Sequence, residues 1–178
     1  TCDHRNVHSL HAYFIRAGDA RAPIHYAVDR IRDGASFSVR RVTASQKGQP
    51  ILIMSASFQI NEDGFAHQMD MPDVPPPESL RSEVELARLV ADRIPVRIRE
   101  QFTCERPIEI RKVNAVNPFA PEKKAPVSYQ RFRAVGTMPA DPTINKCLLA
   151  YASDFGLLGT SLRPHGVTYF QRDLMTAS

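Results

Sequence analysis

The sequence predicts an α+β protein with two antiparallel β-sheets, each wrapped around a central helix. Three observations indicate this fold class. A series of β-rich runs separated by turn signals fills residues 7–60. A second group of β-rich runs follows a proline-rich segment. A stretch that is apolar on almost every side of a helix comes after that group, at residues 144–158.

The first sheet is expected to contain four strands. β-rich runs cover residues 7–15, 24–31 and 51–60, and a fourth lies between Asp33-Gly34 and Lys47-Gly48, dipeptides typical of hairpin turns. These runs predict an antiparallel meander. In the last run one face is fully apolar, and it carries Leu52, Met54, Ala56, Phe58 and Ile60. No helix-period segment lies among these strands, so the helix that covers this face must come from outside them.

Residues 66–105 are expected to be an interdomain linker that contains a helix. The segment holds Pro75-Pro76-Pro77, and then Ser82 followed three residues later by Glu85, which is typical of a capping box at a helix start. Pro95 should interrupt the helix that begins there. We therefore predict an N-terminal domain over residues 1–65, the linker over 66–105 and a C-terminal domain over 106–178.

The C-terminal domain should begin with strands at residues 106–113 and 127–138. Asp141 as N-cap and Pro142 at the first helical position then predict a helix through residues 144–158. A helix that is apolar all round is a buried helix. An antiparallel sheet around one buried helix is the hotdog arrangement, so the fold class is a double hotdog. The first half of the chain lacks its central helix, and the second half lacks most of its sheet. We therefore expect a chain that is truncated at both ends.

Composition argues against several classes of protein. Of the 178 residues, 43% are hydrophobic and 24% charged, values typical of a folded globular chain. No apolar run approaches the roughly 20 residues that cross a bilayer, and residues 1–6 lack the apolar stretch of a signal peptide. The three cysteines, Cys2, Cys104 and Cys147, form no close pair, which argues against a disulfide framework and against a four-cysteine zinc site. A reducing compartment is the simplest interpretation.

The net charge of +4 raises the question of nucleic acid. The basic residues are scattered, and their densest pairs, Arg40-Arg41 and Lys123-Lys124, are short. A basic stripe and an aromatic RNA-binding pattern are both missing. The pattern therefore favours a small anionic ligand, such as a nucleotide-bearing cofactor, over nucleic acid.

The chain resembles the type II acyl-CoA thioesterases, a family of bacterial cytoplasm and of peroxisomes. The matching stretches are VHSLHAYF at residues 7–14, RAGD at 16–19, RDGASF at 32–37 and ASFQ at 56–59. HQ at 67–68, MP at 71–72, YASD at 151–154 and PHG at 164–166 continue the match. Each motif is weak alone, but the ordered set covers essentially the whole chain.

The resemblance implies a hydrolytic site in the second hotdog, where an Asp, a Thr or Ser, and a Gln orient and activate a water. Asp154 matches the Asp of the family. The hydroxyl residue of the family falls on Ser178, the last residue, and the Gln is expected beyond it. The first hotdog's helix, which carries a Gly-Gly-Gln stretch in the family, would precede Thr1.

The chemistry of Asp154 can also be argued from the residue itself. A carboxylate on an otherwise apolar helix needs a partner when it is buried. A thioester is an activated acyl group, so a positioned water with a general base can hydrolyse it without a covalent nucleophile. The alternative for Asp154 is a polar group at a helix end that faces solvent, since Gly156 and Gly159 follow closely.

Other candidate residues have simpler explanations. Cys147 with His165 could form a nucleophile pair, but a cysteine in an apolar helix is usually part of the core. His8 and His11 are an odd number of residues apart in a strand and should point to opposite faces, so no metal site is expected. Arg40-Arg41 and Lys123-Lys124 could touch CoA phosphates, although an exposed charged pair is usually solvated surface.

We therefore expect an enzyme that hydrolyses medium- or long-chain acyl-CoA to fatty acid and CoA. No metal or redox cofactor is implied. We expect a homo-oligomer located in the cytoplasm, with the peroxisome as the alternative. The rival functions are an acyl-CoA-binding module without catalysis and a hotdog hydratase. A hydratase would need a His and an Asp on one helix, and the helix with Asp154 has no His.

Overall fold

The structure is a computed structural model that describes residues 4–168. The chain divides into two compact units between Gln68 and Met69, and each unit contains one antiparallel sheet. None of the helices within residues 4–168 has both the length and the apolar character needed to cross a bilayer.

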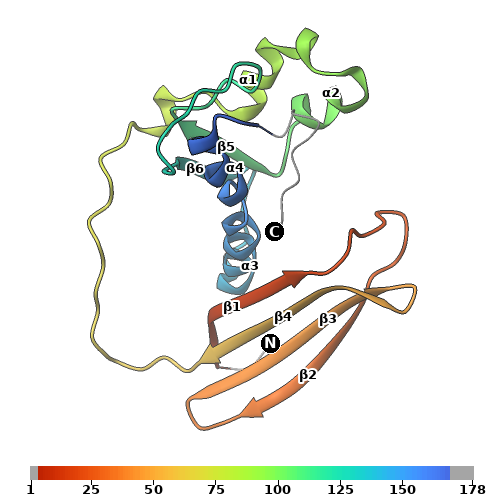
Figure 1. Ribbon diagram of the computed structural model, residues 1–178. Coiled ribbons are helices and arrows are strands. Elements are labelled where there is room, and N and C mark those ends of the chain that lie inside the picture. The colour runs from red at the N-terminus through yellow and green to blue at the C-terminus, as the bar shows by residue number, and fades with distance from the viewer. Residues whose placement is uncertain (1–3, 169–178) are drawn as a thin grey trace. The chain divides into compact units, whose positions relative to one another are not determined.

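The first unit is a single four-stranded sheet made of β1 (Asn6–Phe14), β2 (His25–Asp33), β3 (Phe37–Gln46) and β4 (Gln49–Gln59). Its strand order is β1-β4-β3-β2, and every pair is antiparallel (Figure 1). The hairpins at Asp33-Gly34 and Lys47-Gly48 are confirmed. Lys47 and Gly48 have φ angles of 50° and 75°, as a two-residue hairpin turn that matches the strand twist requires.

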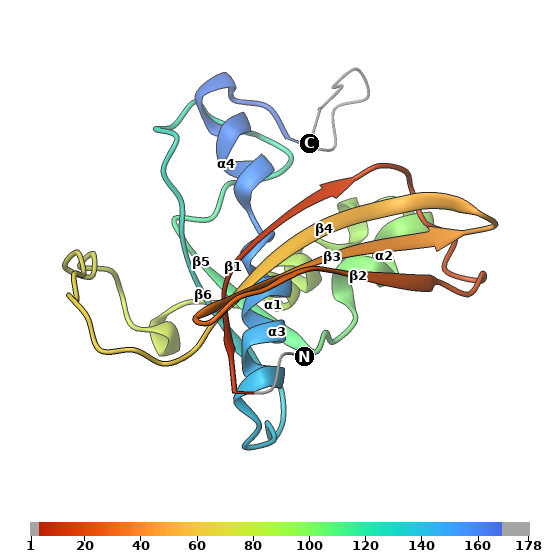
Figure 2. The same cartoon turned by 90° about the horizontal axis from the view of Figure 1, so that it is seen from below.

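The predicted meander is correct for β2, β3 and β4 but wrong for β1, which pairs with β4 instead of β2. The connection from β1 to β2 is too long for a tight hairpin and is anchored at the β3–β4 turn. The Gln46 side chain accepts a hydrogen bond from Asp19 N at 2.8 Å, and it donates to Asp19 O and Ala22 O at 2.8 Å each. Figure 2 shows this connection at the end of the sheet where β3 turns into β4.

The apolar face of this sheet is only partly buried by the described residues. Leu10, Ala12 and Phe14 of β1 lie opposite Ala56, Met54 and Leu52 of β4, so they extend the predicted apolar face. Ala44 and Ala56 are buried, whereas Phe14 and Tyr26 are 62% and 66% exposed. As expected, no helix lies among residues 4–68.

The second unit begins with short helices. These are η1 (Pro77–Ser79), α1 (Glu83–Leu89), η2 (Ala91–Arg93) and α2 (Val96–Thr103). The capping box is confirmed, because Ser82 Oγ accepts from Glu85 N at 3.1 Å and Glu85 Oε2 accepts from Ser82 N at 2.6 Å. The hydrogen bonds from Ser82, its backbone N–H first, hold the pKa of Glu85 below its usual value. The interruption is also confirmed, since Pro95 lies between α1 and α2 as the N-cap of α2.

The rest of the second unit is a hairpin followed by helices. It consists of β5 (Ile108–Val113), β6 (Tyr129–Ala134), α3 (Pro142–Ser153), α4 (Leu157–Leu162) and η3 (Arg163–His165). Two contacts tie α1 to β5: a β-bridge between Ser82 and Arg111, and an ion pair between Glu83 and Lys112 at 2.7 Å. The helical segment therefore packs within this unit. The expected division into residues 1–65, 66–105 and 106–178 stays a prediction.

The core of the second unit lies between the hairpin and one side of α3. Ile108, Ile110 and Ala152 are buried together, and Leu148 and Phe155 pack against them. Within the described chain this helix is covered on one side only, since Leu149 is 58% exposed and Tyr151 65% exposed, and its burial on all sides stays a prediction. The physical reason is that β5 and β6 cover a single side of the helix.

Candidate functional site

Asp154 lies at the junction of α3 and α4. The N-terminal prediction for α3 is confirmed, with Asp141 accepting a hydrogen bond from Thr143 N at 2.8 Å. The predicted end at residue 158 is wrong, because α3 ends at Ser153 and Asp154 is its C-cap. Gly156 ends the helix: its φ angle of 89° is left-handed, and the chain restarts from it as α4.

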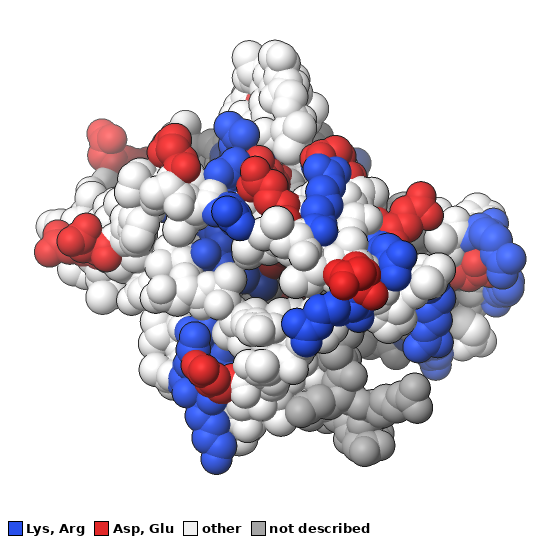
Figure 3. Space-filling model, turned by 90° about the horizontal axis from the view of Figure 1, so that it is seen from above, with Lys and Arg blue, Asp and Glu red and all other residues white. Residues whose placement is uncertain are grey.

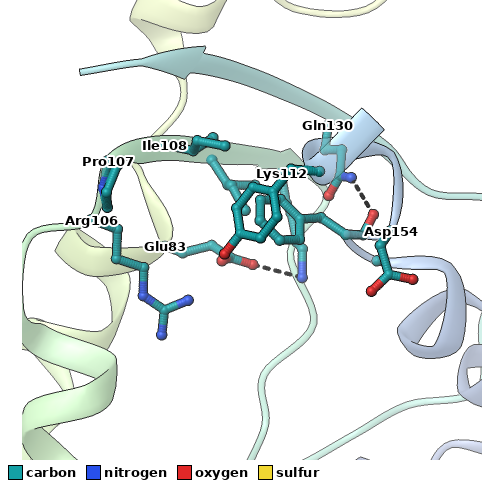
Figure 4. Close-up of a pocket in the computed structure, with 11 residues that line it drawn as sticks. Glu83, Arg106, Pro107, Ile108, Lys112, Gln130 and Asp154 are labelled. Carbon is teal, nitrogen blue, oxygen red and sulfur yellow. Dashed lines mark hydrogen bonds and ion pairs between the residues drawn. The ribbon is translucent and has the colours of Figure 1, made fainter. Parts of the chain in front are cut away.

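The carboxylate of Asp154 is exposed and borders a pocket of about 440 Å³. No residue within the described range forms a hydrogen bond or ion pair with it. Its exposure corrects the expectation of a buried carboxylate, whereas the expected partner, Ser178, lies outside the described residues. Apolar residues from β5, from the residue before it and from the region around the end of α3 form part of the pocket wall, namely Pro107, Ile108, Ile110, Tyr151 and Phe155 (Figure 4). Among the described residues, an anionic group without a partner therefore borders a partly apolar pocket.

The other charged groups of the pocket are engaged with neighbours. Lys112 Nζ lies 2.7 Å from Glu83 Oε1, so these two charges offset each other. Arg106 donates a hydrogen bond to Gln101 O at 2.6 Å. In Figure 4 the carboxylate of Asp154 points away from the Glu83–Lys112 pair. Among the described residues of this pocket, Asp154 is thus the carboxylate still available to act on a bound molecule.

Gln130 is a pocket residue that sequence reasoning missed. It lies on β6 directly opposite Lys112 of β5, and its Nε2 donates to Phe155 O at 2.6 Å (Figure 4). Its Oε1 is buried and has no hydrogen-bond partner among the described residues. Strand alternation could have placed Gln130 on the same face as Phe132, but nothing in the sequence indicated the contact with Phe155.

The glycine at 156 is required for two separate reasons, which gives a first testable prediction. A non-glycine residue at a left-handed φ costs about 1–2 kcal/mol. A methyl group on Gly156 would also lie 3.1 Å from Gln130 Oε1 and 3.3 Å from Gln130 Nε2. We expect Gly156→Ala to lower the melting temperature of the protein more than the backbone strain alone would.

Gly136→Ala is the matched control, because Gly136 has a φ of 94° and a methyl group there would meet no atom within 4 Å. The additional loss at Gly156 should shrink when Gln130 is also changed to Ala. Equal losses at the two glycines would contradict the packing of Gln130 against Gly156.

The other half of the predicted catalytic pair cannot be placed. Ser178 lies outside the described residues, so no distance joins it to Asp154. Cys147 is exposed, so its assignment to the core is wrong. The cause is that β5 and β6 leave one side of α3 uncovered, which also exposes Leu149.

The prediction that His8 and His11 point to opposite faces of their strand is also wrong. A β-bulge between Val7 and Ser9 shifts the register, so that His11 lies opposite Ser55 while His8 Nε2 is 2.9 Å from Ser57 Oγ. Ser55 and Ser57 share a face of β4, and both imidazoles therefore lie on that face. Even so, no group of three or more His, Cys, Asp or Glu side chains within residues 4–168 is arranged to hold a metal ion.

The Arg40-Arg41 pair does not present two cations on one face of its sheet. Arg40 forms an ion pair with Asp33 at 2.5 Å, and this guanidinium, followed by the Ser38 hydroxyl, holds the pKa of Asp33 below its usual value. Arg41, as the next residue of β3, faces the other side of the sheet. Among the described residues on the face shown in Figure 3, basic and acidic side chains are interspersed.

Comparisons with known proteins match one family model in each half of the chain. Residues 1–59 match the family model "Acyl-CoA thioesterase N-terminal domain", and residues 97–178, which include Asp154 and Ser178, match the model "Acyl-CoA thioesterase". A relative from Haemophilus influenzae, "Acyl-CoA thioesterase 2", is 40% identical over 98% of this chain. The chain spans 61% of the length of that relative.

Solved structures show the same resemblance. An acyl-CoA thioesterase II from Mycobacterium marinum is 36% identical, with a TM-score of 0.69 over 93% of this chain and 56% of the other. A protein of unknown function with a hot dog fold, from Alicyclobacillus acidocaldarius, has a TM-score of 0.62 at 19% identity, over 89% of this chain and 53% of the other. The latter likeness supports the fold alone.

Proposed function

Because the chain belongs to the type II acyl-CoA thioesterase family and has its hotdog fold, we propose that the full-length protein hydrolyses medium- and long-chain acyl-CoA to fatty acid and CoA. One observation carries this proposal. In the half of the chain matched by the thioesterase model, Asp154 is a carboxylate that has no hydrogen-bond or ion-pair partner among residues 4–168, and it lies at the edge of a partly apolar pocket. Such a pocket suits the apolar part of a substrate, and the carboxylate suits the activation of a water.

The proposed reaction uses Asp154 as general base. The carboxylate accepts a proton from a water whose oxygen attacks the thioester carbonyl carbon. The tetrahedral intermediate then collapses with cleavage of the C–S bond, and the sulfur leaves as CoA thiolate and takes up a proton. Ser178 orients the water or the carboxylate through its hydroxyl group, and a Gln beyond Ser178 completes the trio. The products are one fatty acid and one free thiol per water consumed.

The test is turnover by the full-length protein. Acyl-CoAs of increasing chain length are offered, and the free thiol of CoA is measured with a thiol reagent while fatty acid is quantified by mass spectrometry. We expect equimolar release of both products, fastest with medium and long chains. A protein that binds a non-hydrolysable thioether analogue of acyl-CoA but releases no CoA would instead be a binding module.

We further propose a homo-oligomer that acts in the cytoplasm, with the peroxisome as the alternative compartment. The described residues leave large apolar side chains exposed in both units, including Phe14 and Leu149. Burial of apolar surface is the main driving force of subunit association. Sedimentation of the full-length protein over a range of concentrations measures its oligomeric state, and a monomer at all concentrations would contradict this part of the proposal.

A further inference from the structure

The turn that carries Asp154 is held from outside the helices by one side chain. Gln130, 25 residues earlier in the chain, donates from Nε2 to Phe155 O, the carbonyl next to Asp154, at 2.6 Å. Inside the turn, Phe155 N donates to Ala152 O at 3.0 Å. Figure 4 shows the bond from Gln130 beside the carboxylate of Asp154. The two peptides that flank Phe155, the residue after Asp154, are therefore each held by one hydrogen bond.

The ring of Phe155 adds a second anchor to the same turn. It packs against the core of Ile108, Ile110 and Ala152 and lies edge-on to Tyr151, with ring centroids 5.1 Å apart. Packing holds the side chain of residue 155, and Gln130 holds its carbonyl. Phe155 lies between α3 and α4, so its carbonyl belongs to the hydrogen-bond ladder of neither helix and needs a donor from elsewhere.

We propose that Gln130 is a positioning residue for Asp154, a role that rests on the proposed function. Gln130 does not touch the reacting atoms. It fixes the orientation of the peptide between Phe155 and Gly156. That peptide restrains the turn from which the Asp154 carboxylate leaves the helix. A shift of about 1 Å in a catalytic group can cost roughly a hundredfold in rate, so this hydrogen bond affects the chemical step.

The contact depends on a hydrogen-bond donor, not on shape alone. Since a carbonyl oxygen can only accept, the group that meets Phe155 O must be the NH₂ of the Gln130 amide. Gln130→Leu keeps much of the side-chain volume but leaves the Phe155 carbonyl without its donor. Gln130→Glu keeps the shape but offers two carboxylate oxygens at neutral pH, which cannot donate to a carbonyl.

The expected result for the full-length protein is a change in kcat with little change in KM. Gln130→Leu should lower kcat for acyl-CoA hydrolysis about tenfold, within the range that misplacement of a catalytic group produces. Gln130→Glu should lower it at least as much at pH 8. A Leu variant with wild-type kcat would overturn the proposal.

The pH dependence of kcat for the Gln130→Glu variant tests the positioning role directly, because a purely structural role of Gln130 would not change it. As the pH falls from 8 toward 5, its carboxyl group begins to take up a proton and regains a donor for Phe155 O. The ratio of its kcat to that of the wild type should therefore rise as the pH falls. A ratio that stays constant over this range would also overturn the proposal.

Gln101→Glu is the matched control. Gln101 is exposed on α2, and within the described chain its side chain forms no hydrogen bond. This variant should show a constant ratio to the wild type. If Gln130→Leu fails to fold, as a thermal melt would show, the pH dependence of the Glu variant still decides the question.

The outcome for Asp154→Asn separates the two proposals. If Asp154→Asn hydrolyses acyl-CoA at the wild-type rate, the proposed mechanism fails, and the role of Gln130 fails with it. If Asp154→Asn loses activity while Gln130→Leu does not, the positioning role alone fails. Loss of activity in both variants, with the pH-dependent ratio of the Glu variant, supports both proposals.

Discussion

Asp154→Asn in the full-length protein is expected to lower kcat for acyl-CoA hydrolysis about a hundredfold or more, the scale of a lost general base. The amide has nearly the same shape as the carboxylate but cannot accept the proton of the attacking water. Because Asp154 is exposed and its carboxylate forms no hydrogen bond or ion pair within residues 4–168, folding should be unaffected. The measurement is steady-state release of free CoA, with a thermal melt of each variant.

Asp141→Asn is the matched control for this substitution. Asp141 caps the other end of the same helix, and Asn is as good an N-cap as Asp. This variant should retain both wild-type activity and wild-type stability. If Asp154→Asn also works at the wild-type rate, Asp154 has no part in the mechanism.

Ser178→Ala is expected to lower kcat about tenfold to a hundredfold, the effect of losing a hydrogen bond to a charged group worth about 1.5–3 kcal/mol. Ser178→Thr should retain substantial activity, because the hydroxyl group, and not a particular shape, orients the water or the carboxylate. The assay is the same release of free CoA by the full-length protein.

Thr176→Ala is the control for Ser178, since it removes a hydroxyl group two residues earlier. It should leave kcat close to the wild-type value. Equal activity in the Ala and Thr variants at position 178 would show that the hydroxyl is irrelevant. A large loss at Thr176 with none at Ser178 would move the role to Thr176.

The features that sequence reasoning predicted correctly depend on residues close together in the chain. The turn at Lys47-Gly48 needs only two residues that tolerate positive φ. The capping box needs Ser82 and Glu85, and the N-cap of α3 needs Asp141 alone. Each of these interactions joins residues that are at most three positions apart in the chain, so the local sequence specifies it.

The features that sequence reasoning missed depend on contacts between distant residues or on small local shifts. The position of β1 beside β4 is supported by Gln46, which holds the connection 24 to 27 residues away. The bulge after Val7 moves His8 to the face of His11. Gly156 is a helix-end signal, yet the apolar run predicts a helix that continues past it to residue 158. In the structure Gly156 separates two helices.

The sequence by itself determined the strands, the turns, the helix starts and, through its ordered motifs, the family and the candidate base Asp154. These follow from local backbone preferences and from patterns that a chain carries in any conformation. Only the tertiary structure decided which strands pair, how much of α3 is covered, and that Gln130 meets the carbonyl beside Asp154. The physical reason is that such contacts join residues far apart in the chain, so they exist only once the folded backbone brings them within hydrogen-bond or van der Waals distance.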